Sequence, residues 1–192
     1  HAKNRASDSP PGKPAMLTRL TIGLVITLGL GGCASMSESQ CKVADWGRVG
    51  LTDGASGAPE GRLADYTEDC GKIGVVPNAQ AYRQAWDVGI QRFCTAGNGW
   101  REGLEGHAGK AQVCVGQAGH EAFSRYLNAG LQVYRTKEKM RENTQETNRL
   151  QKQLESSAVD EEKRQIRRKL QDLDRDQFYL RGVMGQQQLM AP

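Results

Sequence analysis

Five cysteines constrain the fold of this chain more than any other sequence feature. They stand at positions 33, 41, 70, 94 and 114. An odd number of cysteines in an exported protein requires a separate role for one of them. If Cys33 has that role, the other four suffice for two disulfides in an oxidising compartment, and three pairings are possible. A zinc site is the competing use, but the chain has no Cys-x-x-Cys pair. We therefore expect two disulfides among Cys41, Cys70, Cys94 and Cys114, and no metal or other cofactor.

The segment before Cys33 explains the odd cysteine. Residues 20–30 are uncharged, follow Arg19, and are too short to span a bilayer, which needs about 20 apolar residues. Leu30-Gly31-Gly32-Cys33 then resembles a bacterial lipobox, in which the cysteine thiol is the nucleophile that accepts the lipid. We expect residues 1–32 to be a signal peptide and Cys33 to carry acyl chains such as palmitate. The alternative is an ordinary signal peptide whose first mature cysteine joins a disulfide.

Two further expectations concern the N-terminal region. Met16 makes a compact start to the signal peptide, so residues 1–15 are expected to lie upstream of the natural start; the alternative is a long polar leader. Ala34, rather than Asp, follows the lipobox cysteine, and by resemblance to Gram-negative sorting this favours the outer membrane. Residues 33–40 are expected to form a lipidated tether that faces the periplasm.

The distribution of charge gives no support to nucleic acid binding. The formal net charge is +4, and residues 1–32 supply most of it, with Lys3, Arg5, Lys13 and Arg19 against Asp8. The rest of the chain is close to neutral, whereas nucleic acid binding requires a basic face that displaces counterions.

The region between the outer pairing cysteines contains an internal duplication. Gly50-x3-Gly54-x2-Gly57 recurs as Gly99-x3-Gly103-x2-Gly106, and each copy lies between two cysteines. This frame favours Cys41–Cys70 and Cys94–Cys114 over crossed pairings. The dipeptides Asp53-Gly54 and Asn98-Gly99 are typical of turns, so both Gly-rich stretches are predicted to be loops.

A second pattern repeats beside the first. Residues 82–93 match residues 123–134 in their aromatic, apolar, glycine and glutamine positions. The apolar residues follow helical spacing, so both segments are predicted to be amphipathic helices. Gly89 and Gly130 occupy equivalent positions in the two segments. Glycine destabilises a helix, so its presence at both positions indicates that another helix crosses closely there. We predict a small, mainly α domain over residues 41–134 that is built from two pseudo-repeats and stapled by disulfides.

The pattern of cysteine, glycine and aromatic residues described above resembles a family of Gram-negative envelope lipoproteins, domain-of-unknown-function family twenty-seven ninety-nine. The resemblance covers about Cys33 to Tyr134 and departs at Asn78, where an acid is expected, and at Ala111 or Gln112, where a tyrosine often precedes the last cysteine. The resemblance implies a fold and a location but no activity. The residues that carry it are Cys41, Asp45, Trp46, Gly50, Asp53, Gly54, Gly57 and Cys70 in the first half, and Pro77, Tyr82, Gly89, Phe93, Cys94, Gly103, Gly106 and Cys114 in the second.

Residues 135–181 have the composition of a long, exposed helix, with 13 basic and 10 acidic residues and no proline. Apolar residues recur on a seven-residue seam, as in a coiled coil. The break at Ser156-Ser157, with Ser157 as helix N-cap, favours two helices folded back as a hairpin over one continuous helix. Residues 182–192 are expected to fray. The seam consists of Ile166, Leu170, Leu173, Gln177, Leu180 and Met184.

A catalytic role has little support in the sequence. His107 and His120 are the only histidines after Cys33, and no Gly-x-Ser-x-Gly motif accompanies them. Glu102 and Glu105 are the candidate acid–base pair, although paired surface acids are usually only solvated.

We therefore expect a structural or partner-binding protein and not an enzyme. Its expected partners are the membrane, through acylated Cys33, and an unidentified envelope protein, through the helical tail; a homo-oligomer is possible. The alternative is a lipoprotein hydrolase or small-ligand binder that acts on cell-wall or lipid material.

Overall fold

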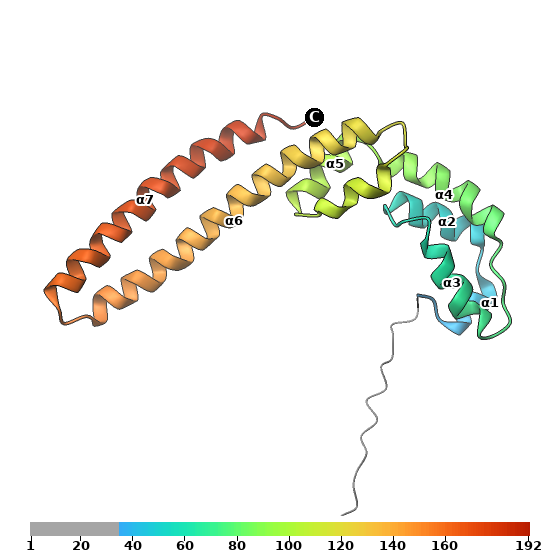
Figure 1. The fold of residues 1–192 in the computed structure, drawn as a ribbon, viewed down its shortest axis with the longest axis horizontal. Coiled ribbons are helices and arrows are strands. Elements are labelled where there is room, and N and C mark those ends of the chain that lie inside the picture. The colour runs from blue at the N-terminus through green and yellow to red at the C-terminus, as the bar shows by residue number, and fades with distance from the viewer. Residues whose placement is uncertain (1–34) are drawn as a thin grey trace, which may run out of the picture. The chain divides into compact units, whose positions relative to one another are not determined.

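The computed structural model describes residues 35–192, so the predicted signal peptide, the lipobox and Cys33 lie outside the described residues. Every regular element in the described part is a helix, and no strand occurs there, which confirms the mainly α prediction (Figure 1). None of these helices is both long and apolar enough to cross a membrane. In chain order the elements are α1 (Glu38–Val43), α2 (Trp46–Ala55), α3 (Arg62–Gly71), α4 (Ala79–Phe93), α5 (Ala96–Leu104), the 3-10 helix η1 (Ala108–Cys114), α6 (His120–Ser156) and α7 (Asp160–Gln188).

The two Gly-rich stretches are helical, which corrects the prediction that they are loops. Gly50, Asp53 and Gly54 lie within α2, and Gly99 and Gly103 lie within α5. Asp45 and Thr95 cap the N-termini of these helices by accepting hydrogen bonds from backbone amides. A helical glycine costs about 1 kcal/mol relative to alanine. The close packing of a second helix offsets that cost here.

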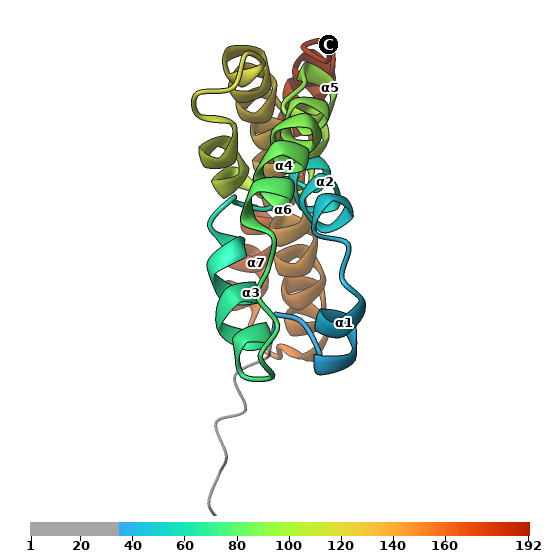
Figure 2. The same cartoon turned by 90° about the vertical axis from the view of Figure 1, so that its right-hand side faces the viewer.

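The two pseudo-repeats make the same helix–helix contact. A Cβ atom at Gly54 would lie 2.4 Å from the carbonyl oxygen of Trp86, and one at Gly103 would lie 2.3 Å from that of Leu127. Helix α2 therefore packs on α4, and α5 on α6, with backbone against backbone (Figures 1 and 2). The close crossing predicted from the matched glycines is confirmed. The other equivalent contacts are Gly50 with Tyr82, Gly99 with Phe123, Gly89 with Leu51, and Gly130 with Trp100.

The third glycine of each motif is the one that turns the chain. Gly57 and Gly106 have φ angles of 65° and 83°, a region that favours glycine. A Cβ atom at either position would also collide with an aromatic ring, Phe93 in the first case and Tyr134 in the second. These two glycines therefore serve both the turn and the packing beneath it.

The predicted disulfide pairing is confirmed. Cys41 pairs with Cys70, which joins α1 to α3, and Cys94 pairs with Cys114, which joins the end of α4 to the end of η1. The sequence separations are 29 and 20 residues. On the loop-entropy account, each bond stabilises the fold by roughly 3 kcal/mol. All four cysteines are buried in the core.

One hydrophobic core serves both pseudo-repeats. The rings of Phe93 and Phe123 lie 5.3 Å apart between centroids and join the two halves. Trp46 and Trp86 are buried in the same core, whereas Trp100 is half-buried. Asn78 caps α4, because its side chain accepts a hydrogen bond from the amide of Ala81. An acidic residue, which the resemblance suggested at this position, would cap the helix in the same way.

Residues 35–40 are not a free tether. The amide and hydroxyl of Ser35 donate to the Asp69 carboxylate at 2.7 and 2.8 Å. Ser37 and Gln40 then form a capping box at the start of α1. The folded domain therefore begins earlier than the predicted boundary at residue 41.

The C-terminal region is a helical hairpin, the arrangement favoured from the sequence. Figure 1 shows α7 returning alongside α6. The predicted boundary at 134/135 falls inside α6, which continues from the second pseudo-repeat to Ser156 without a break. Helix α7 extends to Gln188, so the expected fraying from residue 182 is wrong. The N-cap of α7 is Val159, and Ser157 instead donates to Glu162.

The hairpin contact combines a narrow apolar seam with polar pairs. Leu150 and Ile166 are buried, and the rest of the predicted seam is half-buried. Asn143, which is buried, donates to Asp176 at 2.6 Å. Thr136 donates to Gln187 at 2.8 Å. Such pairs fix the register of a seam that contains few apolar residues.

Candidate functional site

Each pseudo-repeat contains one buried carboxylate at the same place in its short helix. Asp53 in α2 and Glu102 in α5 are 6% and 8% exposed. Each precedes the turn glycine of its motif, and the backbone carbonyl of each accepts an amide hydrogen bond of 2.9 Å, from Ala58 and His107 respectively. His107 therefore occupies the position that Ala58 occupies in the first pseudo-repeat.

The carboxylate of Asp53 is enclosed by tyrosines. The hydroxyls of Tyr66 and Tyr82 donate to its Oδ2 at 3.0 and 2.8 Å, and Arg62 lies 3.7 Å from Oδ1. Burial, and to a lesser extent the hydrogen bond to Asp53, raises the pKa of Tyr66 to about 12. The same two causes raise the pKa of Tyr82 further. Because two internal hydroxyls and a nearby guanidinium compensate for the burial of this carboxylate, we interpret the group as one that stabilises the fold.

We expect the stability of the domain to fall at alkaline pH. Tyrosine ionises near pH 10 in the unfolded chain, whereas Tyr66 holds its proton to about pH 12 in the folded one. The stabilisation is therefore complete below pH 10 and is lost as the pH rises toward 12. Urea unfolding between pH 8 and 11 measures this dependence.

Phenylalanine variants distinguish the effect of these two buried tyrosines on stability from the effect of an exposed tyrosine. Tyr66→Phe with Tyr82→Phe should lower stability at pH 8 and flatten its decline above pH 10. Tyr179→Phe, at a position that is 66% exposed, should leave both unchanged. Equal pH dependence in the wild type and the double variant would contradict the assignment.

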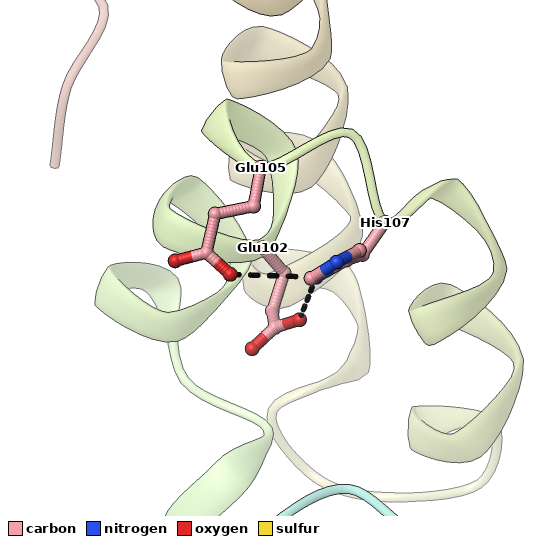
Figure 3. A group of neighbouring side chains, drawn as sticks. All are labelled: Glu102, Glu105 and His107. Atoms are coloured by element: carbon pink, nitrogen blue, oxygen red, sulfur yellow. Dashed lines mark hydrogen bonds and ion pairs between the residues drawn. The ribbon is translucent and has the colours of Figure 1, made fainter.

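The carboxylate of Glu102 has different surroundings. His107 Nδ1 lies 2.9 Å from Glu102 Oε2 and 3.4 Å from Glu105 Oε2, and Figure 3 shows both glutamates on the same side of the His107 ring. Arg101 is 3.8 Å from the other oxygen of Glu102. The three side chains border an open hollow of about 420 Å³ that Gly109 and Lys110 complete. The two glutamates considered as a candidate acid–base pair thus lie beside a histidine.

The hollow has no hydroxyl or thiol nucleophile in its lining. No serine, threonine or cysteine is among the residues that line it. The second candidate histidine, His120, contacts Ser124 at 3.4 Å and forms no ion pair within residues 35–192. Of the two candidate histidines, only His107 therefore forms ion pairs with acidic side chains within residues 35–192.

A second candidate surface lies on α7. Phe178 and Tyr179 are 79% and 66% exposed, although their neighbours Gln177 and Leu180 face the hairpin seam. Elsewhere on the hairpin, several exposed charged residues form ion pairs three positions apart along the same helix. Two large aromatic side chains on such a surface are unusual for a helix that only covers a core.

Comparison with protein families gives one match. Residues 45–132 match the family described as "Protein of unknown function (DUF2799)". These residues are a DUF2799 domain. The match begins at the cap of α2 and ends within α6, so the DUF2799 domain contains both helix pairs and both buried carboxylates. Most of the hairpin lies beyond it. No curated protein and no solved structure matches the chain.

The equivalence of the two carboxylates was not among the predictions from the sequence. The spacing that relates the glycine motifs of the DUF2799 domain also places Asp53 opposite Glu102, and this signal was available in the sequence. The partners of Asp53 were not, because Tyr66 and Tyr82 lie 13 and 29 residues away and reach it only in the folded state.

Proposed function

We propose that this protein is an outer-membrane lipoprotein that faces the periplasm and binds another envelope protein through its helical hairpin. The lipobox-like sequence ending at Cys33 supports the anchor. Two disulfides support an oxidising compartment, since such bonds are rare in reducing ones. The proposed role is non-catalytic, and the disulfide-bonded domain holds the hairpin near the membrane.

The exposed aromatic pair on α7 is the observation that carries the binding role. Phe178 and Tyr179 contribute little to the hairpin seam, which Leu150 and Ile166 fill. Aromatic side chains and arginine are enriched in protein interfaces, and exposed arginines stand nearby at positions 175 and 181. The partner we propose is a different protein, and the crosslinking experiment below distinguishes it from a second copy of this chain.

Site-specific photocrosslinking in intact cells tests this role. A photoreactive amino acid at position 178 should give a discrete crosslinked species whose mass equals this chain plus one other protein. The same amino acid at Gln145, an exposed position on α6, should not give that species. Phe178 and Tyr179 are expected to be hot-spot residues, so Tyr179→Ala should weaken the crosslink at 178 by tenfold or more, a loss of at least about 1.4 kcal/mol.

Two results would overturn the proposal. A species with twice the mass of this chain would replace the heterologous partner with a homodimer. Equal crosslinking from positions 178 and 145 would show that the aromatic pair has no special role.

A further inference from the structure

The carboxylate of Glu102 lacks the enclosing donors that its counterpart possesses. In the first pseudo-repeat, Tyr82 donates to Asp53 at 2.8 Å. The equivalent residue in the second is Phe123, which has no hydroxyl to donate. The same fold position therefore holds a carboxylate that is closed in one half and open in the other.

Glu102 is nevertheless nine-tenths buried. Its side chain is 10% exposed. Within residues 35–192, the only hydrogen bond of its carboxylate is the one with His107 Nδ1 at 2.9 Å, and the guanidinium of Arg101 remains 3.8 Å away. A buried carboxylate normally has donors or a cation to compensate for the loss of water. A bound cation would supply that compensation here.

Lys110 does not supply that charge, although it borders the same hollow. Its ammonium group donates to the backbone carbonyls of Ser56 and Gly57 at 3.3 and 3.0 Å and lies above the ring of Phe93. The ammonium group of Lys110 is therefore bound to the first pseudo-repeat. The side of the hollow nearest the glutamates remains available to another cation.

The neighbouring side chains have the spacing of metal ligands. One donor atom from each of Glu102, Glu105 and His107 lies within 4.8 Å of the others. The two glutamate oxygens are 2.9 and 3.4 Å from the histidine nitrogen (Figure 3). Tetrahedral Zn²⁺, with bonds of about 2.0–2.2 Å, places its ligand atoms about 3.4 Å apart. Small rotations of the exposed Glu105 and His107 would therefore close the site around an ion.

We propose that Glu102, Glu105 and His107 bind a divalent transition-metal ion of the Zn²⁺ type. An imidazole nitrogen with carboxylate oxygens suits Zn²⁺, whereas Mg²⁺ prefers oxygen ligands and retains its water. Three protein ligands leave the fourth position open to the hollow, for water or a side chain of another molecule. This site does not depend on the proposed role of the hairpin.

Calorimetric titration of the tag-free full chain with ZnCl₂, with both disulfides intact, tests the proposal. We expect one saturable site per chain and no saturable binding of MgCl₂. His107→Gln and Glu105→Gln, both at exposed positions, should each weaken Zn²⁺ binding by at least about tenfold. Circular dichroism should show that these variants remain folded. Co²⁺ in place of Zn²⁺ should give visible absorption bands that His107→Gln abolishes.

The matched control variants are His120→Gln and Glu121→Gln, which change the same residue types away from the cluster. They should bind Zn²⁺ as the wild type does. The proposal is overturned if the wild type shows no saturable binding below about 1 mM. It is equally overturned if His107→Gln binds Zn²⁺ as tightly as His120→Gln.

Discussion

Gly54→Ala should destabilise the domain by about 3 kcal/mol or more, although the change adds a single methyl group to a helix. The added Cβ would lie 2.4 Å from the carbonyl oxygen of Trp86 and 2.7 Å from the amide nitrogen of Ile90. Both atoms belong to the backbone of α4, so no side-chain rotation can relieve the collision. The helices must separate, which opens the core around them.

A matched glycine elsewhere should respond in the opposite direction. Gly97 lies in α5, and a Cβ atom added there meets no atom within 4 Å. Gly97→Ala should therefore be neutral or should stabilise the domain by up to about 1 kcal/mol. Urea unfolding of both variants measures the difference. Equal stabilities would show that α2 and α4 do not cross as closely as the structure has them.

The duplicated glycine pattern allowed part of the fold to be predicted. Because Gly89 and Gly130 recur at matching positions, the sequence pointed to two close helix crossings, and both are present. The cysteines that flank each motif led to the correct disulfides. The serine pair at 156–157 located the hairpin turn within a few residues.

The prediction that the two Gly-rich stretches are loops is wrong because it rests on local turn propensity alone. Asp53-Gly54 and Asn98-Gly99 are turn-like by themselves, yet they lie within α2 and at the start of α5. Glycine is needed at those helical positions because the partner helix leaves no space for a side chain, and that requirement appears only when the two segments pack. Tertiary contact therefore overrides helix propensity.

The change in composition near residue 135 was also misleading. It predicts a domain boundary, but α6 continues through it. The helix loses its apolar character there because it leaves the shared core, and its remaining burial comes from α7. Composition reports what surrounds a helix and not where the helix ends.

Cys33→Ser should abolish lipid attachment and remove the protein from the outer-membrane fraction. Serine in its place lacks the thiol that we expect to accept diacylglycerol, so the precursor should remain uncleaved at this position. Stable anchoring requires more than one acyl chain, and the variant would have none. The disulfide-bonded domain should fold normally, because its two bonds do not involve residue 33. Near-ultraviolet circular dichroism of the variant provides that control.

Intact-mass analysis of the protein extracted from cell envelopes tests the central claim most directly. We predict a mature chain that begins at Cys33, carries the added mass of diacylglycerol and further acylation, and lacks four hydrogens because of its two disulfides. The same species should fractionate with the outer membrane, and Cys33→Ser should eliminate it. A mature chain that begins elsewhere and carries no acyl group would contradict the account, as would a Cys33→Ser variant that still fractionates with the outer membrane.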